Sequence, residues 1–170
     1  MEAKKAKNSH ATSTRIVLPN DTNVLGNLMG GQLLNWMDMI GAISCHRHCG
    51  RIVVTASVNN VSFDNPIDLG DVVTLEAKVS RAFTSSMEVF IDVWVEHHKS
   101  GKKKKCNEAI YTFVAIDQMG SPIEVPDITP ETDQEKERYN SSLRRKQLSL
   151  ILDGKMKPKD ATELKALFEE

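Results

Sequence analysis

The segment at residues 30–49, GGQLLNWMDMIGAISCHRHC, constrains the fold more than any other part of the chain. It contains no proline, and its apolar side chains would fall on every side of a helix rather than along one narrow stripe. A helix that is apolar nearly all round is normally buried. The rest of the chain must therefore supply elements that cover this segment.

Strand patterns dominate both flanks of the predicted helix. Before it, the run RIVL at 15–18 stops at Pro19, which predicts a strand that enters a loop. Four further runs are continuously apolar or alternate apolar with polar residues, and they lie at 52–58, 72–79, 87–95 and 110–116. Turn residues and a lysine-rich tip at 99–105 separate them. Strands joined by short turns pair antiparallel.

One strand, one buried helix and an antiparallel run exclude a doubly wound parallel sheet, because that fold alternates strands with helices. We predict an α+β domain of the hotdog type, in which a curved antiparallel β-sheet wraps around the central buried helix. We place this domain at 14–126 and expect residues 1–13 to be a disordered N-terminus. The composition becomes charged and polar after Pro126, so we expect 127–170 to be a charged, partly helical C-terminal tail.

Composition and charge restrict the classes of partner. The formal net charge is -1, which gives no global attraction to nucleic acid or to a membrane surface. No stretch approaches the ~18 consecutive apolar residues of a membrane span, and the N-terminal lysines are not followed by an apolar segment. Cys45, Cys49 and Cys106 cannot all pair within one chain, which fits a reducing compartment. We therefore expect a cytoplasmic protein that binds no nucleic acid and has no membrane span.

Asp38 is the most informative polar residue, because it lies in the middle of the apolar helix between Met37 and Met39. Burying a lone carboxylate is costly unless the group is paired, hydrogen-bonded or facing a cavity. Asp38 is therefore a candidate catalytic group. The alternative is a narrow polar strip, shared with Gln32 and Asn35, that faces water or a subunit interface.

Two features that precede Asp38 could act together with a carboxylate. Gly30 and Gly31 open the helix, where unpaired N–H groups and the positive end of the dipole can receive a developing oxyanion. A plain junction between loop and helix would look the same. Asn23, in the loop before them, could orient a water molecule or a carbonyl, although asparagine in a turn commonly bonds its own backbone.

The order of these segments resembles one enzyme family. LPNDTNVLGNLMGGQLLNWMDMIGA followed by VVTASVNNVSFDNPIDLGD is similar to the acyl-CoA thioesterases of the hotdog superfamily, both the bacterial ones and the two-domain cytosolic hydrolases of animals. The resemblance implies that Asn23 and Asp38 are the catalytic pair and that Thr55 assists them. It also implies a homodimer with sites at the interface, Asn from one half and Asp from the other, and further assembly into a trimer of dimers.

The segment SRAFTSSMEV at 80–89 resembles the strand edge along which the family binds the pantetheine arm of CoA. Here Arg81 could meet a phosphate, and three hydroxyl groups could bond the amides of the arm. These hydroxyls belong to Thr84, Ser85 and Ser86. The tip lysines, Lys103 and Lys104 among them, could attract the phosphates of the CoA nucleotide or form an ordinary solvated turn.

The run Cys-His-Arg-His-Cys at 45–49 contains residue types that bind zinc. Ligands crowded into one helical turn rarely complete a tetrahedron alone, and histidines near a helix C-terminus complement its dipole. We therefore interpret this run as the polar end of the helix and expect no metal ligands.

The resemblance implies hydrolysis of fatty acyl-CoA to a free fatty acid and CoA, with Asp38 as general base or as nucleophile. No cofactor is expected, because CoA is part of the substrate and of the product. The alternative function is a non-catalytic acyl-CoA-binding regulator or scaffold of the hotdog fold. A hotdog dehydratase is a third option, but its chemistry usually has a His-centred motif, and no histidine lies between Ser13 and Cys45.

Overall fold

Five strands form one antiparallel sheet in the computed structural model, which describes residues 1–59, 61–63 and 65–168. The first of them covers 11–16 rather than the predicted 15–18. The strand order is β2-β4-β5-β6-β3, so the two strands nearest to the helix in sequence lie at opposite edges. The strands are β2 (Ala11–Ile16), β3 (Ile52–Asn59), β4 (Val72–Ala82), β5 (Ser86–Glu96) and β6 (Lys103–Ile116). The prediction of an antiparallel sheet with one helix against it is confirmed.

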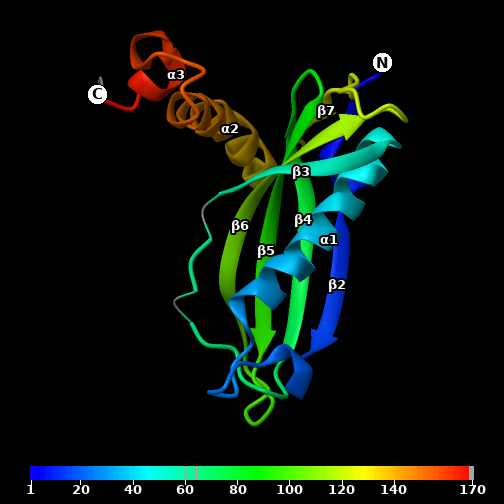
Figure 1. Ribbon diagram of the computed structural model, residues 1–170, viewed down its shortest axis with the longest axis vertical. Helices are drawn as coiled ribbons and strands as arrows, with labels where there is room; N and C mark the ends of the chain where they lie inside the picture. Colours follow the sequence, from blue (N-terminus) through cyan, green and yellow to red (C-terminus); the bar gives the residue numbers. More distant parts are fainter. Residues whose placement is uncertain (60, 64, 169–170) are drawn as a thin grey trace.

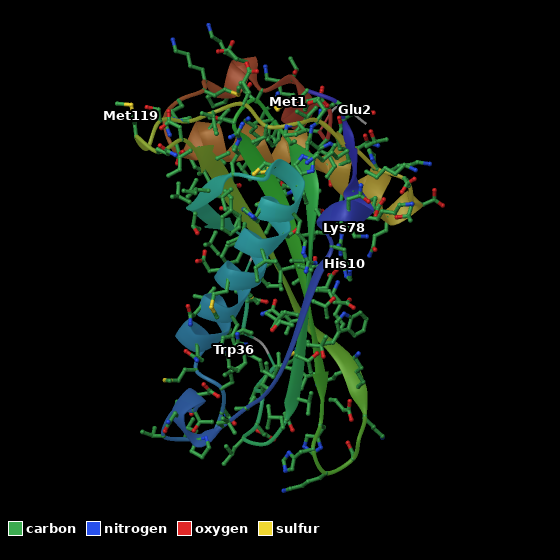
Figure 2. All side chains as sticks on the ribbon, turned by 90° about the vertical axis from the view of Figure 1, so that its right-hand side faces the viewer. Met1, Glu2, His10, Trp36, Lys78 and Met119 are labelled. Carbon is green, nitrogen blue, oxygen red and sulfur yellow. The ribbon has the colours of Figure 1, made fainter. Side chains whose placement is uncertain are left out.

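The long helix α1 (Gly30–Cys49) lies across one face of this sheet. Viewed at right angles, α1 and the sheet form two layers (Figure 2). Met37 and Cys45 on the helix and Leu75 and Phe113 on the sheet are fully or almost fully buried between the layers. The layers are in close contact at Gly41, where a Cβ atom would lie 2.7 Å from the ring of Phe113. Only glycine fits this position without displacing that ring.

Within one chain, α1 is buried on one side only. Met39 and Ile43, on the side that faces away from the sheet, keep 39% and 46% of their surface exposed. The edge strand β3 adds further exposed apolar side chains, with Ile52 at 62%. The helix is apolar all round because it has two apolar surfaces. One packs against the sheet, and the other is exposed in the single chain.

The N-terminus corrects the prediction of disorder over residues 1–13. Strand β1 (Lys4–Lys5) and the 3-10 helix η1 (Ala6–Ser9) precede β2, which begins at Ala11. Ala6 is 2% exposed, and the buried Ser9 accepts a hydrogen bond of 3.0 Å from the backbone N–H of Val79. The prediction was wrong because small residues that pack and bond the backbone leave no apolar pattern.

The C-terminal segment returns to the domain and then packs on it. Strand β7 (Ile128–Thr129) pairs in parallel with β1. Helix α2 (Asp133–Leu152) contacts β4 and β5 on the face opposite α1, and it projects from the upper end of the sheet in Figure 1. The short elements η2 (Pro19–Asp21), η3 (Pro158–Asp160) and α3 (Thr162–Lys165) complete the structure. The boundary at 127 stays a prediction, and Glu169 and Glu170 of the predicted tail lie outside the described residues.

Three ion pairs attach α2 to the sheet. Arg138 donates bidentate hydrogen bonds of 2.8 and 2.9 Å to the carboxylate of Asp92, and Arg145 does the same to Glu88. At the start of the helix, Lys78 of β4 contacts Glu135 at 2.7 Å. In the part of the chain that the structure describes, no helix is long and apolar enough to cross a membrane.

Candidate active site

Asp38 and Thr55 are brought together from two different elements. Asp38 lies half-buried on α1, and Thr55 on β3 donates a hydrogen bond of 2.5 Å from its Oγ1 to Asp38 Oδ1. The β3–β6 pairing shifts register immediately after Thr55, so the strand is irregular at this point. Asp38 is thus neither packed in the core nor part of a freely solvated strip. Its carboxylate is oriented by one hydroxyl and keeps its second oxygen for other partners.

Tyr111 is a third member of this group, and the sequence reading missed it. Its hydroxyl donates a hydrogen bond of 3.1 Å to the backbone carbonyl of Leu34, which lies one helical turn before Asp38. Burial and the negative charge of Asp38 raise the pKa of Tyr111 to about 12, so its phenol stays protonated. The alternation of 110–116 carries the signal, because Tyr111 and Phe113 share the strand face that meets α1.

Asn23 has the bonding of a turn residue. Its Oδ1 accepts hydrogen bonds from the N–H groups of Leu25 at 2.9 Å and Asn27 at 3.2 Å, and its side chain is exposed. These bonds fix the amide and direct its Nδ2 donor group elsewhere. Asn23 precedes α1, whereas Asp38 lies eight residues (38 − 30) beyond the first residue of that helix, or about 12 Å along its axis. One chain therefore does not bring Asn23 to Asp38.

Gly30 and Gly31 differ in their surroundings. A Cβ atom on Gly30 would lie 3.3 Å from the ring of Phe63, whereas one on Gly31 would meet nothing within 4 Å. No side chain caps the start of the helix at Met29, and the space beside Gly31 is open. A ligand atom could therefore approach the first backbone N–H groups of α1. A hollow of about 340 Å³ lies beside them and is lined by Asn23 and Gly30, among others.

The predicted pantetheine segment lies at the same end of the sheet as Thr55. Ser86 pairs with Val114 on β6, and the next pair along, Met87 with Phe113, is continued by Thr55 on β3. Thr84 is exposed and Ser85 half-buried in the turn between β4 and β5. This row places all three hydroxyl residues of the segment near the Thr55 side of the site.

Arg81 and Lys146 form a pair of cations around Phe83. The guanidinium of Arg81 lies 4.1 Å from the ring centre of Tyr139 and donates to the Tyr139 carbonyl, while Lys146 Nζ lies 3.5 Å from the ring centre of Phe83. Burial and the charge of Arg81 lower the pKa of Lys146. Within the described residues neither cation has a carboxylate in ion-pair range. Lys146 lies on α2, where a charge run gave no reason to single it out.

Lys103 and Lys104 lie far from that pair. They stand opposite Glu96 and Val95 at the far end of β5, ten residues (96 − 86) from Ser86, which is roughly 33 Å along a strand. The tip that they adjoin is at the lower end of the sheet, near the loop that precedes α1 (Figure 1). The two predicted CoA-binding groups are therefore not brought together within one chain.

The predicted residues thus form two groups in one chain. Asn23, Gly30, Gly31 and the tip lysines lie toward the lower end, and Asp38, Thr55, Arg81 and the hydroxyl segment lie higher. The exposed apolar side of α1 and the edge strand β3 adjoin Asp38. A second surface must complete any site that uses both groups.

The residues at 45–49 have other partners. Cys45 is fully buried in the core, and Nε2 of His48 lies 2.7 Å from the carbonyl oxygen of Pro126. Because a carbonyl only accepts, His48 carries its proton on Nε2. Lys4 Nζ donates to the His48 carbonyl at 2.6 Å, so this end of α1 is a junction with the N-terminus and with the segment before β7.

Comparison with known proteins identifies close relatives. The model of the thioesterase superfamily matches residues 25–102. The chain is 42% identical to the uncharacterized acyl-CoA thioester hydrolase YkhA of Bacillus subtilis, over 85% of this chain and 84% of that protein. It is 40% identical to mouse acyl-coenzyme A thioesterase 11 and 33% identical to the rat cytosolic acyl coenzyme A thioester hydrolase, over 81% and 77% of this chain. It spans only 23% and 35% of those two longer proteins.

Solved structures agree with the sequence relatives. An acyl-CoA hydrolase from Bacillus cereus superposes with a TM-score of 0.86 at 33% identity, covering 98% of both chains. An apo-hexameric acyl-CoA thioesterase gives 0.82 at 36% identity, covering 86% of this chain and 94% of its own. An acyl-CoA hydrolase of Staphylococcus aureus gives 0.81 at 35% identity, covering 96% and 99%, and was solved with butyryl coenzyme A and coenzyme A. Its variants replace an asparagine, an aspartate or a threonine by alanine.

Proposed function

We propose, from the premise that this chain belongs to the acyl-CoA thioester hydrolases of the thioesterase superfamily, that it hydrolyses fatty acyl-CoA with Asp38 as its catalytic carboxylate. The observation that carries the proposal is the hydrogen bond from Thr55 to Asp38. It links a residue of α1 to a residue of β3. The residue types replaced in the Staphylococcus aureus variants, asparagine, aspartate and threonine, are those at 23, 38 and 55.

In the proposed reaction Asp38 acts as a general base. The Thr55 hydroxyl holds one carboxylate oxygen, and the other takes a proton from a water molecule as the water oxygen bonds to the thioester carbon. The C–S bond then breaks, and the CoA sulfur leaves as a thiolate that takes up a proton. Amides at the start of α1 stabilise the oxyanion, and Asn23 positions the water or the carbonyl. Tyr111 keeps the turn that carries Asp38 in place.

The proposed site is shared between two copies of the chain. The start of α1 is about 12 Å from Asp38 along the helix and Asn23 lies before that start, so a facing copy must supply one of the two groups. The exposed apolar residues Met39, Ile43 and Ile52 lie on the surface that such a copy would cover. We propose a homodimer arranged as a trimer of dimers, which the hexameric state in the name of one structural neighbour supports.

We propose that CoA lies along the turn at Thr84, Ser85 and Ser86, with a phosphate between Arg81 and Lys146. Two neighbouring cations without carboxylate partners attract an anion, and Arg presents a planar donor set to phosphate. Lys103 and Lys104 can contribute only from the facing copy, because they lie roughly 33 Å away in their own chain. We place the enzyme in the cytoplasm, as the name of the rat relative suggests.

Replacing Asp38 with Asn tests the proposed role. Asparagine keeps the size of the side chain and can still accept from Thr55, but it cannot take a proton from water. We expect kcat for thiol release from a fatty acyl-CoA to fall by about 10²–10⁴ with an unchanged circular dichroism spectrum. Asn35→Ala, an exposed change one turn earlier on α1, is the control and should keep full activity. Wild-type turnover by D38N would exclude Asp38 as the base.

Mixing two inactive variants tests the shared site. Asn23→Ala and Asp38→Ala chains, unfolded and refolded together, should form some dimers in which one of the two sites has both native residues. We expect activity to reappear in the mixture, while each variant refolded alone stays inactive. If the mixture has no more activity than its parts, both residues act within one chain and the shared-site model fails.

A further inference from the structure

A second group of ligand-type side chains lies at the lower end of the sheet, apart from Asp38 and Thr55. Asp71 stands immediately before β4, and His97 and His98 follow β5. The Asp71 side chain is only 3% exposed, and its Oδ1 lies 2.8 Å from His98 Nδ1. The same oxygen accepts the backbone N–H of His98 at 2.9 Å, and Oδ2 accepts that of Asp68 at 3.1 Å. The carboxylate is therefore held in a fixed orientation.

The two imidazoles are close enough to converge with this carboxylate. One ligand atom from each of Asp71, His97 and His98 lies within 4.8 Å of the others. The two rings are tilted by 34° with their centres 5.0 Å apart, so they are not stacked face to face. His97 Nε2 also lies 3.8 Å from Asp68 Oδ2, which places a second carboxylate beside the group.

We propose that Asp71, His97 and His98 form a binding site for a divalent first-row transition-metal ion such as Zn²⁺, with the carboxylate of Asp68 beside them as the fourth ligand. Two imidazoles with one or two carboxylates are a donor set that such ions prefer. Within the described residues, this is the one group of three or more such side chains close enough to share an ion. The site is separate from the hydrolytic chemistry, which needs no metal in the mechanism proposed above.

The surroundings of Asp71 suit a carboxylate that ligates a metal ion. Its carboxylate is buried, and it accepts hydrogen bonds from the backbone N–H groups of His98 and Asp68. Backbone donors that orient a ligating carboxylate are a regular part of metal sites. The ion would take the place of the proton between His98 Nδ1 and Asp71 Oδ1, and the neutral His98 ring would then carry its proton on Nε2, which leaves the Nδ1 lone pair for the ion.

Binding would fasten the hairpin tip to the loop beside Asn23. Asp68 forms a bridge with Asn27, and the backbone N–H of Leu69 donates to the Gly26 carbonyl at 3.0 Å. The N–H of Leu28 donates to the Ile67 carbonyl at 2.7 Å. An ion held by Asp71 and the two histidines would thus reduce opening of the segment that carries Asn23. Metal binding itself does not depend on the proposed function. Only the effect of that binding on catalysis, through Asn23, rests on it.

The test is calorimetric titration of chelator-stripped protein with ZnCl₂. We expect one Zn²⁺ per chain, and His97→Ala and His98→Ala should each weaken the affinity by at least about 10-fold, because even groups that only support a ligand are worth that much. His46→Ala removes an exposed histidine elsewhere and should bind as wild type does. Cys106→Ser should also keep binding, because Cys106 is not one of the three converging side chains.

Two outcomes would overturn the site. Binding that survives both histidine changes, or that disappears in C106S, would assign the ion to other ligands. A second readout is hydrogen exchange of residues 23–28 with and without ZnCl₂, which we expect to slow in the wild type and to be indifferent to the ion in H98A. Zinc binding without that slowing would remove the link to the Asn23 segment. Neither readout depends on thioester hydrolysis, so failure of the site and failure of the proposed activity are distinguishable.

Discussion

The two long helices lie on opposite faces of one sheet and are held there by different forces. Helix α1 packs through fully buried apolar side chains such as Met37, and at Gly41 it comes within contact distance of the Phe113 ring. Helix α2 packs through charged pairs, of which Arg138 with Asp92 is one. Apolar packing contributes to the free energy of unfolding of the whole domain. Ion pairs position an element but contribute less to that free energy, because the charges can pair with water instead.

The largest difference between the two faces should appear on truncation of Met37. Met37→Ala removes a fully buried side chain between α1 and the sheet, and we expect it to lower the free energy of unfolding by about 2–5 kcal/mol. Leu148→Ala, at an exposed position of α2, should change it by less than about 0.5 kcal/mol. Urea denaturation of both variants measures the difference. Equal losses would mean that α2 belongs to the same cooperative core as α1.

A smaller effect should follow from adding one methyl group at Gly41. The added Cβ would lie 2.7 Å from the Phe113 ring, so the helix or the ring must move. We expect Gly41→Ala to cost about 1–3 kcal/mol in spite of the better helix propensity of alanine. Gly31→Ala, where a Cβ meets nothing, is the matched control and should not destabilise the fold. A stabilised G41A would show that the α1 interface is looser than the contact indicates.

Arg138→Ala should affect α2 alone. It leaves Asp92 with Lys105 as its remaining partner at 2.7 Å, so we expect a cost of about 1–2 kcal/mol rather than the loss of a wholly unpaired buried charge. Faster hydrogen exchange should be confined to α2 and absent from α1. Arg144→Ala, a change at a neighbouring α2 position, should leave exchange of α2 unaltered. Acceleration that spreads to α1 would contradict independent attachment.

The smallest effect is the pH dependence of α2 attachment. Burial opposes ionisation of Asp92 and Glu135, but Arg138 and Lys105 for the first, and Lys78 for the second, outweigh it and lower both pKa values below the ordinary 3.8 and 4.5. Their contribution is complete above the ordinary values and is lost as the pH falls through the lower folded values. We expect α2 to become protease-sensitive below about pH 4 before α1 unfolds, at less than about 1 kcal/mol per group.

A double variant, Asp92→Asn with Glu135→Gln, removes both titrating groups and serves as the control for this pH dependence. Its α2 should be loosened to the same degree at neutral and at acidic pH. An acid-induced opening of α2 that persists in the double variant would contradict the assignment of the effect to Asp92 and Glu135.

The elements that the sequence predicted correctly are those held by apolar packing. Alternation over 72–79 and 87–95 was enough, because each inward residue, Val73 and Val89 among them, is buried. The attachment of α2 left no such pattern, since Arg138 and Arg145 look like solvated charges until Asp92 and Glu88 are seen beneath them. The N-terminal elements were missed for a related reason, because one of their anchors is the hydroxyl of Ser9.

The candidate site was predicted unevenly. The position of Asp38 in an apolar helix marked it on chemical grounds, and the resemblance to thioesterases added Thr55. Neither could supply Tyr111, whose role depends on a hydrogen bond to a carbonyl on another element. Sequence could not show that the tip lysines and Arg81 lie at opposite ends of the sheet, because that separation follows from the length of β5, the strand between β4 and β6.

The Ser9 anchor has a consequence for anyone who shortens this protein for expression or crystallisation. Trimming to Thr14, the first residue of the domain as read from sequence, would delete β1 and the acceptor for the Val79 amide. It would also uncover Ile128, which is 5% exposed under its present cover. In the shortened protein, β7 would be an unpaired strand edge, and the backbone N–H of Val79 in β4 would have lost its acceptor. Unpaired backbone groups at a sheet edge promote self-association. Any trimmed version should therefore keep the chain from Lys4 onward.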